Sequence, residues 1–151
     1  GAVGGAVAAF ALAGGARVIG TARPENHAHL SALGVDATTY GPGLAERVTA
    51  LAPDGVFAAV HAAPSPSLPD LLAIVGDATR VVTVVDKSGA SALGIRAVDA
   101  VNDSALLDRA ADFGRRGLFS PRVDHVLPLA SIAQAHELAA GGSGKVVVTL
   151  P

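Results

Sequence analysis

The sequence predicts an α/β fold, in which a parallel β-sheet is covered by helices on both faces. Strand patterns and helix patterns alternate along its 151 residues, as parallel neighbouring strands with crossover helices require. Two of the strand patterns are continuous apolar runs, which is typical of strands covered on both faces. Half of the residues are hydrophobic, so there is enough apolar surface for one core, and residues 1–151 are expected to form one domain.

The first 22 residues organise the chain. Glycines at positions 1 and 4 begin a stretch of small apolar residues, the pair Gly14-Gly15 stops it, and a β-branched strand follows at residues 17–22. Glycine lets helix and strand backbones approach closely, and the free N–H groups of a helix start attract a pyrophosphate. Other α/β domains also begin helices with glycine. We nevertheless interpret this stretch as the turn, helix and second strand of a dinucleotide-binding βαβ unit.

The fold expected from this unit is a Rossmann-like doubly wound parallel sheet, N-terminally truncated because the first strand is missing. Pro24 is placed to begin the next helix, and Gly41-Pro42-Gly43 predicts a turn. Further helices are predicted at residues 24–33, 44–51, 70–75, 104–114 and 128–138. Further strands are predicted at residues 37–40, 56–63, 80–85, 95–98, 123–126 and 145–150, with residues 86–89 closing the strand before them.

Charge and composition exclude several classes of partner. The net charge is −2 and the two signs are interspersed, so neither nucleic acid nor a membrane surface is an expected partner. The sequence contains no cysteine, which excludes disulfides and thiolate metal sites and is compatible with the cytoplasmic location that we expect. No apolar run is long enough to predict a membrane span.

Two separate motifs resemble the zinc-free, quinone-oxidoreductase-like branch of the medium-chain dehydrogenase/reductase superfamily. One is Gly1-Ala2-Val3-Gly4 with the alanine-rich helix and residues 15–22 after it, where Ala2 replaces a glycine of the family fingerprint. The other is the pattern P-L-x-x-I-x-x-A-H-x-L from Pro128, followed by G-K-V-V-V. The resemblance implies that residues 1–151 are a partial NADP-binding Rossmann domain. The first strand and the GroES-like catalytic domain would precede residue 1.

The end of the second strand predicts the cofactor. NAD-binding domains commonly place Asp or Glu there to bind the ribose hydroxyls, whereas this strand ends in Thr21-Ala22-Arg23. The guanidinium of Arg23 is a permanently charged, forked donor that suits a 2′-phosphate. We therefore predict NADP rather than NAD, the alternative being that Arg23 is a solvated loop residue.

The resemblance also implies the other cofactor contacts, which follow the strands of the sheet. The predicted cofactor-binding residues are Gly1, Ala2, Val3, Gly4, Ala22, Arg23, Tyr40, Ala63, Val85, Asp86 and Lys87. Two of them are ambiguous. Asp86 stands where the family often has glycine, and its carboxylate would repel an anionic cofactor unless it points away. Tyr40 could equally be an aromatic residue packed at a strand end.

No residue is predicted to be a catalytic acid or base, or to bind a metal. His27 and His29 are two positions apart, which places them on different sides of a helix. His61 lies in a buried run and is interpreted as a strand-end core histidine rather than a base, and His136 as structural. Residues 141–145 lack the spacing and the following helix of a phosphate loop, and no serine has a G-x-S-x-G setting.

The resemblance implies a function as well. Full-length relatives of this branch pass hydride from NADPH to a quinone, an enone or a similar activated carbonyl, and the nicotinamide carries that chemistry. We predict that this chain is the cofactor-binding portion of such an enzyme and is inactive alone. Two alternatives remain, a non-catalytic dinucleotide-binding or interaction module and the enoyl-reductase part of a larger synthase. Whether the chain forms a homo-oligomer stays open.

Overall fold

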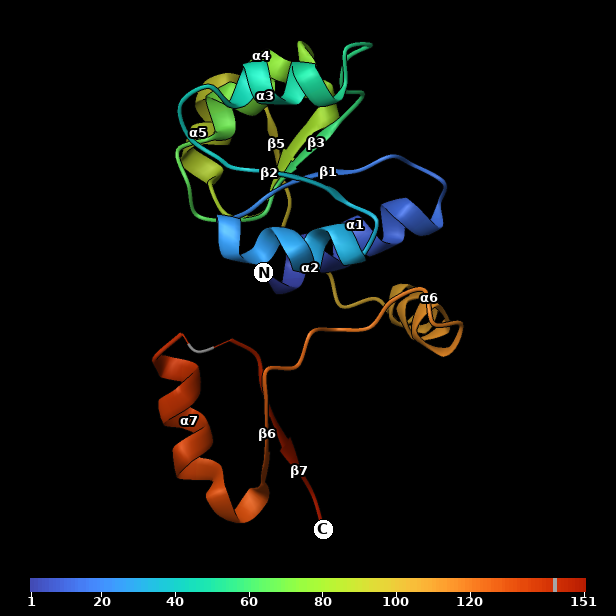
Figure 1. Ribbon diagram of the computed structural model, residues 1–151, viewed down its shortest axis with the longest axis vertical. Coiled ribbons are helices and arrows are strands. Elements are labelled where there is room, and N and C mark those ends of the chain that lie inside the picture. Colours follow the sequence, from blue (N-terminus) through green and yellow to red (C-terminus); the bar gives the residue numbers. More distant parts are fainter. Residues whose placement is uncertain (143) are drawn as a thin grey trace. The chain divides into compact units, whose positions relative to one another are not determined.

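The computed structural model describes residues 1–142 and 144–151. The chain divides into two compact units, one of Gly1 and Val3–Phe119 and the other of Ala2 and Ser120–Pro151. Both units are built from helices and parallel strands (Figure 1), so the predicted α/β class is confirmed. That residues 1–151 are one partial nucleotide-binding domain stays a prediction. Within the described residues, no helix combines the length and the apolar character needed to cross a membrane.

Helix α1 (Ala2–Ala13) ends at the predicted glycine pair, where Gly15 has a positive φ of 82°. It begins earlier than predicted. The N–H of Gly5 donates to the carbonyl of Gly1 over 2.9 Å, so residues 2–4 are helical and do not form a turn. Alanine favours the helix, and a glycine in it costs only about 1 kcal/mol, so the local sequence allows the first turn to close at once.

Two parallel sheets lie in the first unit. One pairs β1 with β2, and the other has the order β3-β4-β5. After α1 the elements are β1 (Ile19–Thr21), η1 (Pro24–Asn26), α2 (His27–Ala32), β2 (Asp36–Thr38), α3 (Leu44–Leu51), β3 (Ala59–His61), α4 (Leu68–Val75), η2 (Ala78–Arg80), β4 (Val81–Thr83), α5 (Lys87–Leu93), β5 (Arg96–Ala97) and α6 (Ser104–Arg115). Every predicted helix and strand of this unit is present, but the strands are shorter than predicted.

Two local features were predicted wrongly. The apolar run at residues 56–63 forms a strand only in its last part, and the Phe57 side chain, 75% exposed, has the guanidinium of Arg80 over its ring instead of packing in the core. Residues 86–89 were predicted to end strand β4, but they form the start of helix α5. The Asp86 side chain accepts a hydrogen bond from the N–H of Gly89 and caps this helix. An aspartate in this position is a strong N-cap, which decides between turn and helix.

The core of the first unit lies between the three-stranded sheet and helices α4 and α5. Leu68, Val81, Ala90 and Ile95 are its buried members. Helix α3 contacts both α4 and strand β2. Figure 1 shows α3, α4 and α5 on one side of the strands of this unit and α1 and α2 on the other. Helices therefore cover both faces, as a parallel sheet requires.

The second unit contains one parallel strand pair and one helix. Strand β6 (His125–Pro128) pairs with β7 (Val146–Thr149), and η3 (Leu129–Ser131) leads into α7 (Ile132–Ala140) between them. The helix predicted from residue 128 thus begins later, because residue 128 still belongs to β6. Ser143, within the glycine-rich stretch 141–145, lies outside the described residues.

Candidate functional site

The candidate site lies at the carboxyl ends of the strands in the first unit. Ligands of parallel α/β folds bind outside these ends. Strand β3 ends at His61, and a Cβ placed on Gly4 would lie 4.0 Å from the Cβ of Ala62. The first turn of α1 therefore meets the end of β3, which brings two parts of the predicted cofactor site together.

The first turn of α1 has free N–H groups. Gly1 occupies the N-cap position and supplies no side-chain hydrogen bond to the helix. Gly1, Ala2 and Val3 are exposed, and Gly4 is half-buried. Unmatched N–H groups at a helix start carry a partial positive charge that suits a phosphate. The predicted fingerprint residues thus lie at an accessible helix start that has no side-chain cap.

The end of β1 differs from its prediction in one respect. The Arg23 Nε lies 3.1 Å from Oε1 of Glu25, with 68% and 60% of the two side chains exposed. The strand end itself carries no acid, as the sequence shows, but the 3₁₀ turn η1 that follows brings Glu25 to Arg23. The backbone of Ala22 is held on both sides, since its N–H donates to Thr38 and its carbonyl lies 3.1 Å from the His27 Nε2.

Tyr40 lies in an exposed loop. Its side chain is 48% exposed, so it is not an aromatic residue packed inside a strand end. The guanidinium of Arg47, on α3, donates to the carbonyls of Thr39, Gly41 and Pro42 over 3.0, 3.2 and 2.8 Å. The sequence interpretation missed this role, although an arginine shortly after a Gly-Pro-Gly turn was a usable signal. Arg47 thus fixes the loop that presents Tyr40.

Polar side chains join the ends of β3 and β4. His61 is 3% exposed, and its Nδ1 lies 3.0 Å from the Thr83 Oγ1, at the end of β4. The same hydroxyl oxygen accepts hydrogen bonds from the backbone N–H groups of Val85 and Asp86. The predicted residues Ala63 and Val85 are exposed in the two loops that follow these strands. The sequence interpretation missed Thr83, which is a polar residue inside an otherwise valine-rich run.

The Asp86 carboxylate is used inside the protein. It accepts hydrogen bonds from the Gly89 N–H over 2.8 Å and from the Ser88 hydroxyl over 3.1 Å. These bonds, the Gly89 N–H first, hold the pKa of Asp86 below its usual value of 3.8. Next to it, the exposed Lys87 pairs with Asp99 over 2.8 Å. The Asp86 carboxylate is thus hydrogen-bonded to the start of α5. An aspartate beside an anionic ligand would need its carboxylate to be held within the protein in this way.

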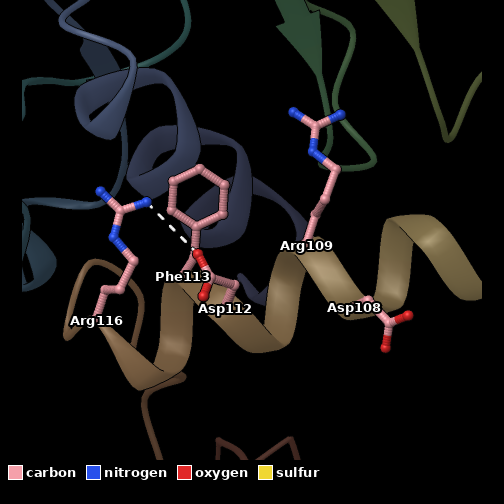
Figure 2. Close-up of a pocket in the computed structure, with 5 residues that line it drawn as sticks. All are labelled: Asp108, Arg109, Asp112, Phe113 and Arg116. Atoms are coloured by element: carbon pink, nitrogen blue, oxygen red, sulfur yellow. Dashed lines mark hydrogen bonds and ion pairs between the residues drawn. The ribbon is translucent and has the colours of Figure 1, made fainter.

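A shallow hollow of about 390 Å³ on α6 is a separate feature. Figure 2 shows Arg116 paired with Asp112 at its rim, over 3.5 Å, and the Phe113 ring directed toward the helix behind it. That ring packs on Phe10 of α1 with the ring centres 5.0 Å apart. None of the predicted cofactor residues lines the hollow, so it is not part of the candidate site.

Across residues 1–142 and 144–151, no group of three or more His, Cys, Asp or Glu side chains is arranged to hold a metal ion. Independence from zinc stays a prediction.

No protein-family model matches the sequence, and no curated protein sequence matches it. Solved structures do match. AibC aligns over 100% of this chain and 47% of its own, with 26% identity and a TM-score of 0.81. A putative alcohol dehydrogenase from Sinorhizobium meliloti 1021 aligns over 100% and 46%, with 25% identity and a TM-score of 0.79. A quinone oxidoreductase from Pseudomonas syringae pv. Tomato DC3000 aligns over 97% and 53%, with 22% identity and a TM-score of 0.68.

The chain therefore has the Rossmann-like fold of one portion of larger proteins, and it spans about half the length of those that it matches. Its structural neighbours are members of the medium-chain alcohol dehydrogenase, quinone oxidoreductase and enoyl reductase superfamily. The superfamily resemblance and the Rossmann-like class predicted from the sequence are confirmed.

Proposed function

We propose that this chain is the cofactor-binding part of an NADPH-dependent, zinc-independent oxidoreductase that reduces a quinone, an enone or a similar activated carbonyl. The observation that carries the proposal is the accessible, uncapped first turn of α1 beside the end of β3. Pyrophosphates bind at such a place in dinucleotide-binding folds. A cytoplasmic location and a small-molecule substrate are parts of the same proposal.

The chain's own residues would bind and orient the cofactor. The N–H groups of the first turn of α1 would hold the pyrophosphate, and Ala22 and Arg23 would hold the adenosine ribose with its 2′-phosphate. Tyr40 would border the adenosine. Ala63 and the exposed residues Val85 and Lys87 would line the path toward the nicotinamide, and Asp86 would act there through its backbone. The bound nicotinamide supplies the hydride chemistry.

We further propose that a strand and a GroES-like catalytic domain from outside residues 1–151 complete the site. Among the described residues, β1 pairs only with β2, and β3 pairs with β4 on one side only. A stranded N–H or carbonyl in a sheet interior costs on the order of 1–3 kcal/mol. A strand placed between β1 and β3 would satisfy both edges and would lead directly into Gly1.

The test compares the isolated chain with a fusion that places such a strand and catalytic domain before residue 1. We expect the isolated chain to bind NADPH weakly and to reduce 1,4-benzoquinone no faster than the buffer. The fusion should bind NADPH more tightly than NADH and should turn over the quinone. Saturable quinone reduction by the isolated chain would overturn the proposal, as would a folded fusion that binds neither cofactor.

A further inference from the structure

Buried polar groups join the carboxyl ends of β3 and β4, where an apolar contact would be expected. His61 is 3% exposed and Thr83 is fully buried. Both nitrogens of the imidazole have partners. The Nδ1 lies 3.0 Å from the Thr83 hydroxyl, and the Nε2 lies 3.1 Å from the backbone carbonyl oxygen of Ser65. Buried polar groups that are fully paired fix one arrangement of the chain segments that they join.

The partners determine which nitrogen carries the proton. The Nε2 also lies 3.3 Å from the Ser65 hydroxyl, but that hydroxyl donates its proton to the Ser67 hydroxyl over 3.2 Å. The carbonyl oxygen of Ser65, at 3.1 Å, can only accept, so the Nε2 carries the hydrogen. The Thr83 oxygen already accepts from the N–H groups of Val85 and Asp86, over 3.2 and 3.1 Å. Its own proton is therefore available for the Nδ1, which is closer than the other possible acceptor, the His61 carbonyl at 3.4 Å. The hydrogen bonds thus require the neutral imidazole with its proton on Nε2.

We propose that His61 is a positioning residue, whose neutral imidazole orients the Thr83 hydroxyl and so orders the loop after β4. With its proton directed to the Nδ1, the hydroxyl presents its lone pairs to the N–H groups of Val85 and Asp86. The Nε2–H binds the loop after β3 at the same time. These loops carry Ala63 and Val85, so the part of the inference that concerns ligand binding rests on the proposed function.

The chain offers a matched set of variants. Thr83→Val removes the hydroxyl with little change of shape, whereas Thr83→Ser keeps it. Ser65→Ala removes the hydroxyl that lies 3.3 Å from the Nε2 and keeps the backbone carbonyl at 3.1 Å, so it tests whether the carbonyl alone holds the imidazole. His61→Asn supplies an amide oxygen close to the position of the Nδ1 and should rescue part of the order that His61→Leu loses.

The first measurement is the tautomer of His61, by ¹⁵N NMR of the imidazole in the full 151-residue chain. We expect a protonated Nε2 and an unprotonated Nδ1 at neutral pH, in the parent and in Thr83→Ser. A proton on the Nδ1, with or without one on the Nε2, would overturn the inference. A purely structural histidine could have either tautomer, so this readout tests the stated geometry.

The second measurement is amide hydrogen exchange at Val85 and Asp86. A hydrogen bond of ordinary strength corresponds to roughly five- to tenfold protection. Thr83→Val should therefore speed exchange at both amides by roughly that factor, compared with amides of the remote helix α6. Thr83→Ser and Ser65→Ala should stay within about twofold of the parent. Unchanged exchange in Thr83→Val would contradict the inference, even if the variant were less stable overall.

The ligand-binding part is measured separately, on the fusion described above. Thr83→Val should weaken NADPH binding by roughly five- to tenfold, and Thr83→Ser should restore it. Equal affinities in the two variants would overturn the ligand-binding part. A parent fusion that binds no nicotinamide cofactor would overturn the proposed function, whereas the tautomer and exchange data would still decide whether His61 orders the loop.

Discussion

The charge at the end of β1 allows a quantitative test of cofactor choice. Arg23 is the proposed partner of the 2′-phosphate, but its guanidinium is paired with Glu25 over 3.1 Å. Binding NADPH would require the arginine to exchange this carboxylate for the phosphate. NADH has no 2′-phosphate, so its binding should not depend on the exchange. Substitutions at the two positions are therefore expected to have opposite effects on NADPH.

The magnitudes follow from the exposure of the pair. A charge-assisted hydrogen bond contributes about 1.5–3 kcal/mol, so Arg23→Ala should weaken NADPH binding roughly ten- to a hundredfold. Because the arginine side chain is 68% exposed, solvent screening favours the lower end of that range. An exposed ion pair contributes about 0.2–1 kcal/mol, so Glu25→Gln should tighten NADPH binding by about 1.5- to fivefold.

The assay is titration of the cofactor's nicotinamide fluorescence with the parent, each single variant and the double variant. NADH affinity should change by less than about twofold in every case. In the double variant the benefit of Glu25→Gln should disappear, because it acts through Arg23. Equal losses for NADPH and NADH in Arg23→Ala would refute the reasoning. Tighter NADH binding by the parent would refute it as well, and would indicate that Glu25 binds the ribose.

Three further predictions concern packing, pH and metal. Gly20→Ala should destabilise the protein by about 1–3 kcal/mol, because the new Cβ would lie 2.8 Å from the Val35 side chain. Thermal unfolding should show a lower Tm for this variant than for Gly5→Ala, whose Cβ meets nothing within 4 Å. Equal Tm values for the two variants would contradict this packing prediction. The Gly89 N–H lowers the pKa of Asp86 in the folded state, so the ionised Asp86 stabilises the protein above about pH 3.8, and this stabilisation is lost as the pH falls through the folded pKa. Asp86→Asn should therefore reduce the loss of Tm below about pH 3.8. A Tm profile at acid pH that is the same in the variant and the parent would count against this role of Asp86. Elemental analysis should find no stoichiometric zinc after dialysis, and retained zinc would argue against the zinc-free branch.

The helices were largely predictable from the sequence, whereas the strand ends were not. Helix α3 has the predicted bounds, because apolar residues at helical spacing follow a glycine-rich turn. Strand β3 is shorter than its apolar run, because hydrophobicity alone does not say which residues find a hydrogen-bonded neighbour. Val60 lies within that strand and is still 41% exposed. A strand is thus determined by pairing with distant residues, which local sequence does not record.

The candidate site, too, was predictable from the sequence only in part. Its glycine-rich helix start, the arginine after β1 and the superfamily resemblance were visible in the sequence, because they depend on residue type and short spacing. The pairing of Arg23 with Glu25 and the bond from Arg47 to the Tyr40 loop depend on how the chain turns back on itself. Neither contact changes the fold class, but both decide which groups are free to meet a ligand.

The sequence by itself determined the α/β class, the order of most elements and the glycine-rich start of α1, since these follow from periodicity and backbone freedom within short segments. Only the tertiary structure decided that His61 meets Thr83, 22 positions away. The physical reason is that a buried polar atom takes the partner that folding brings within hydrogen-bonding distance. For His61 that partner lies on the neighbouring strand, and no local sequence pattern predicts it.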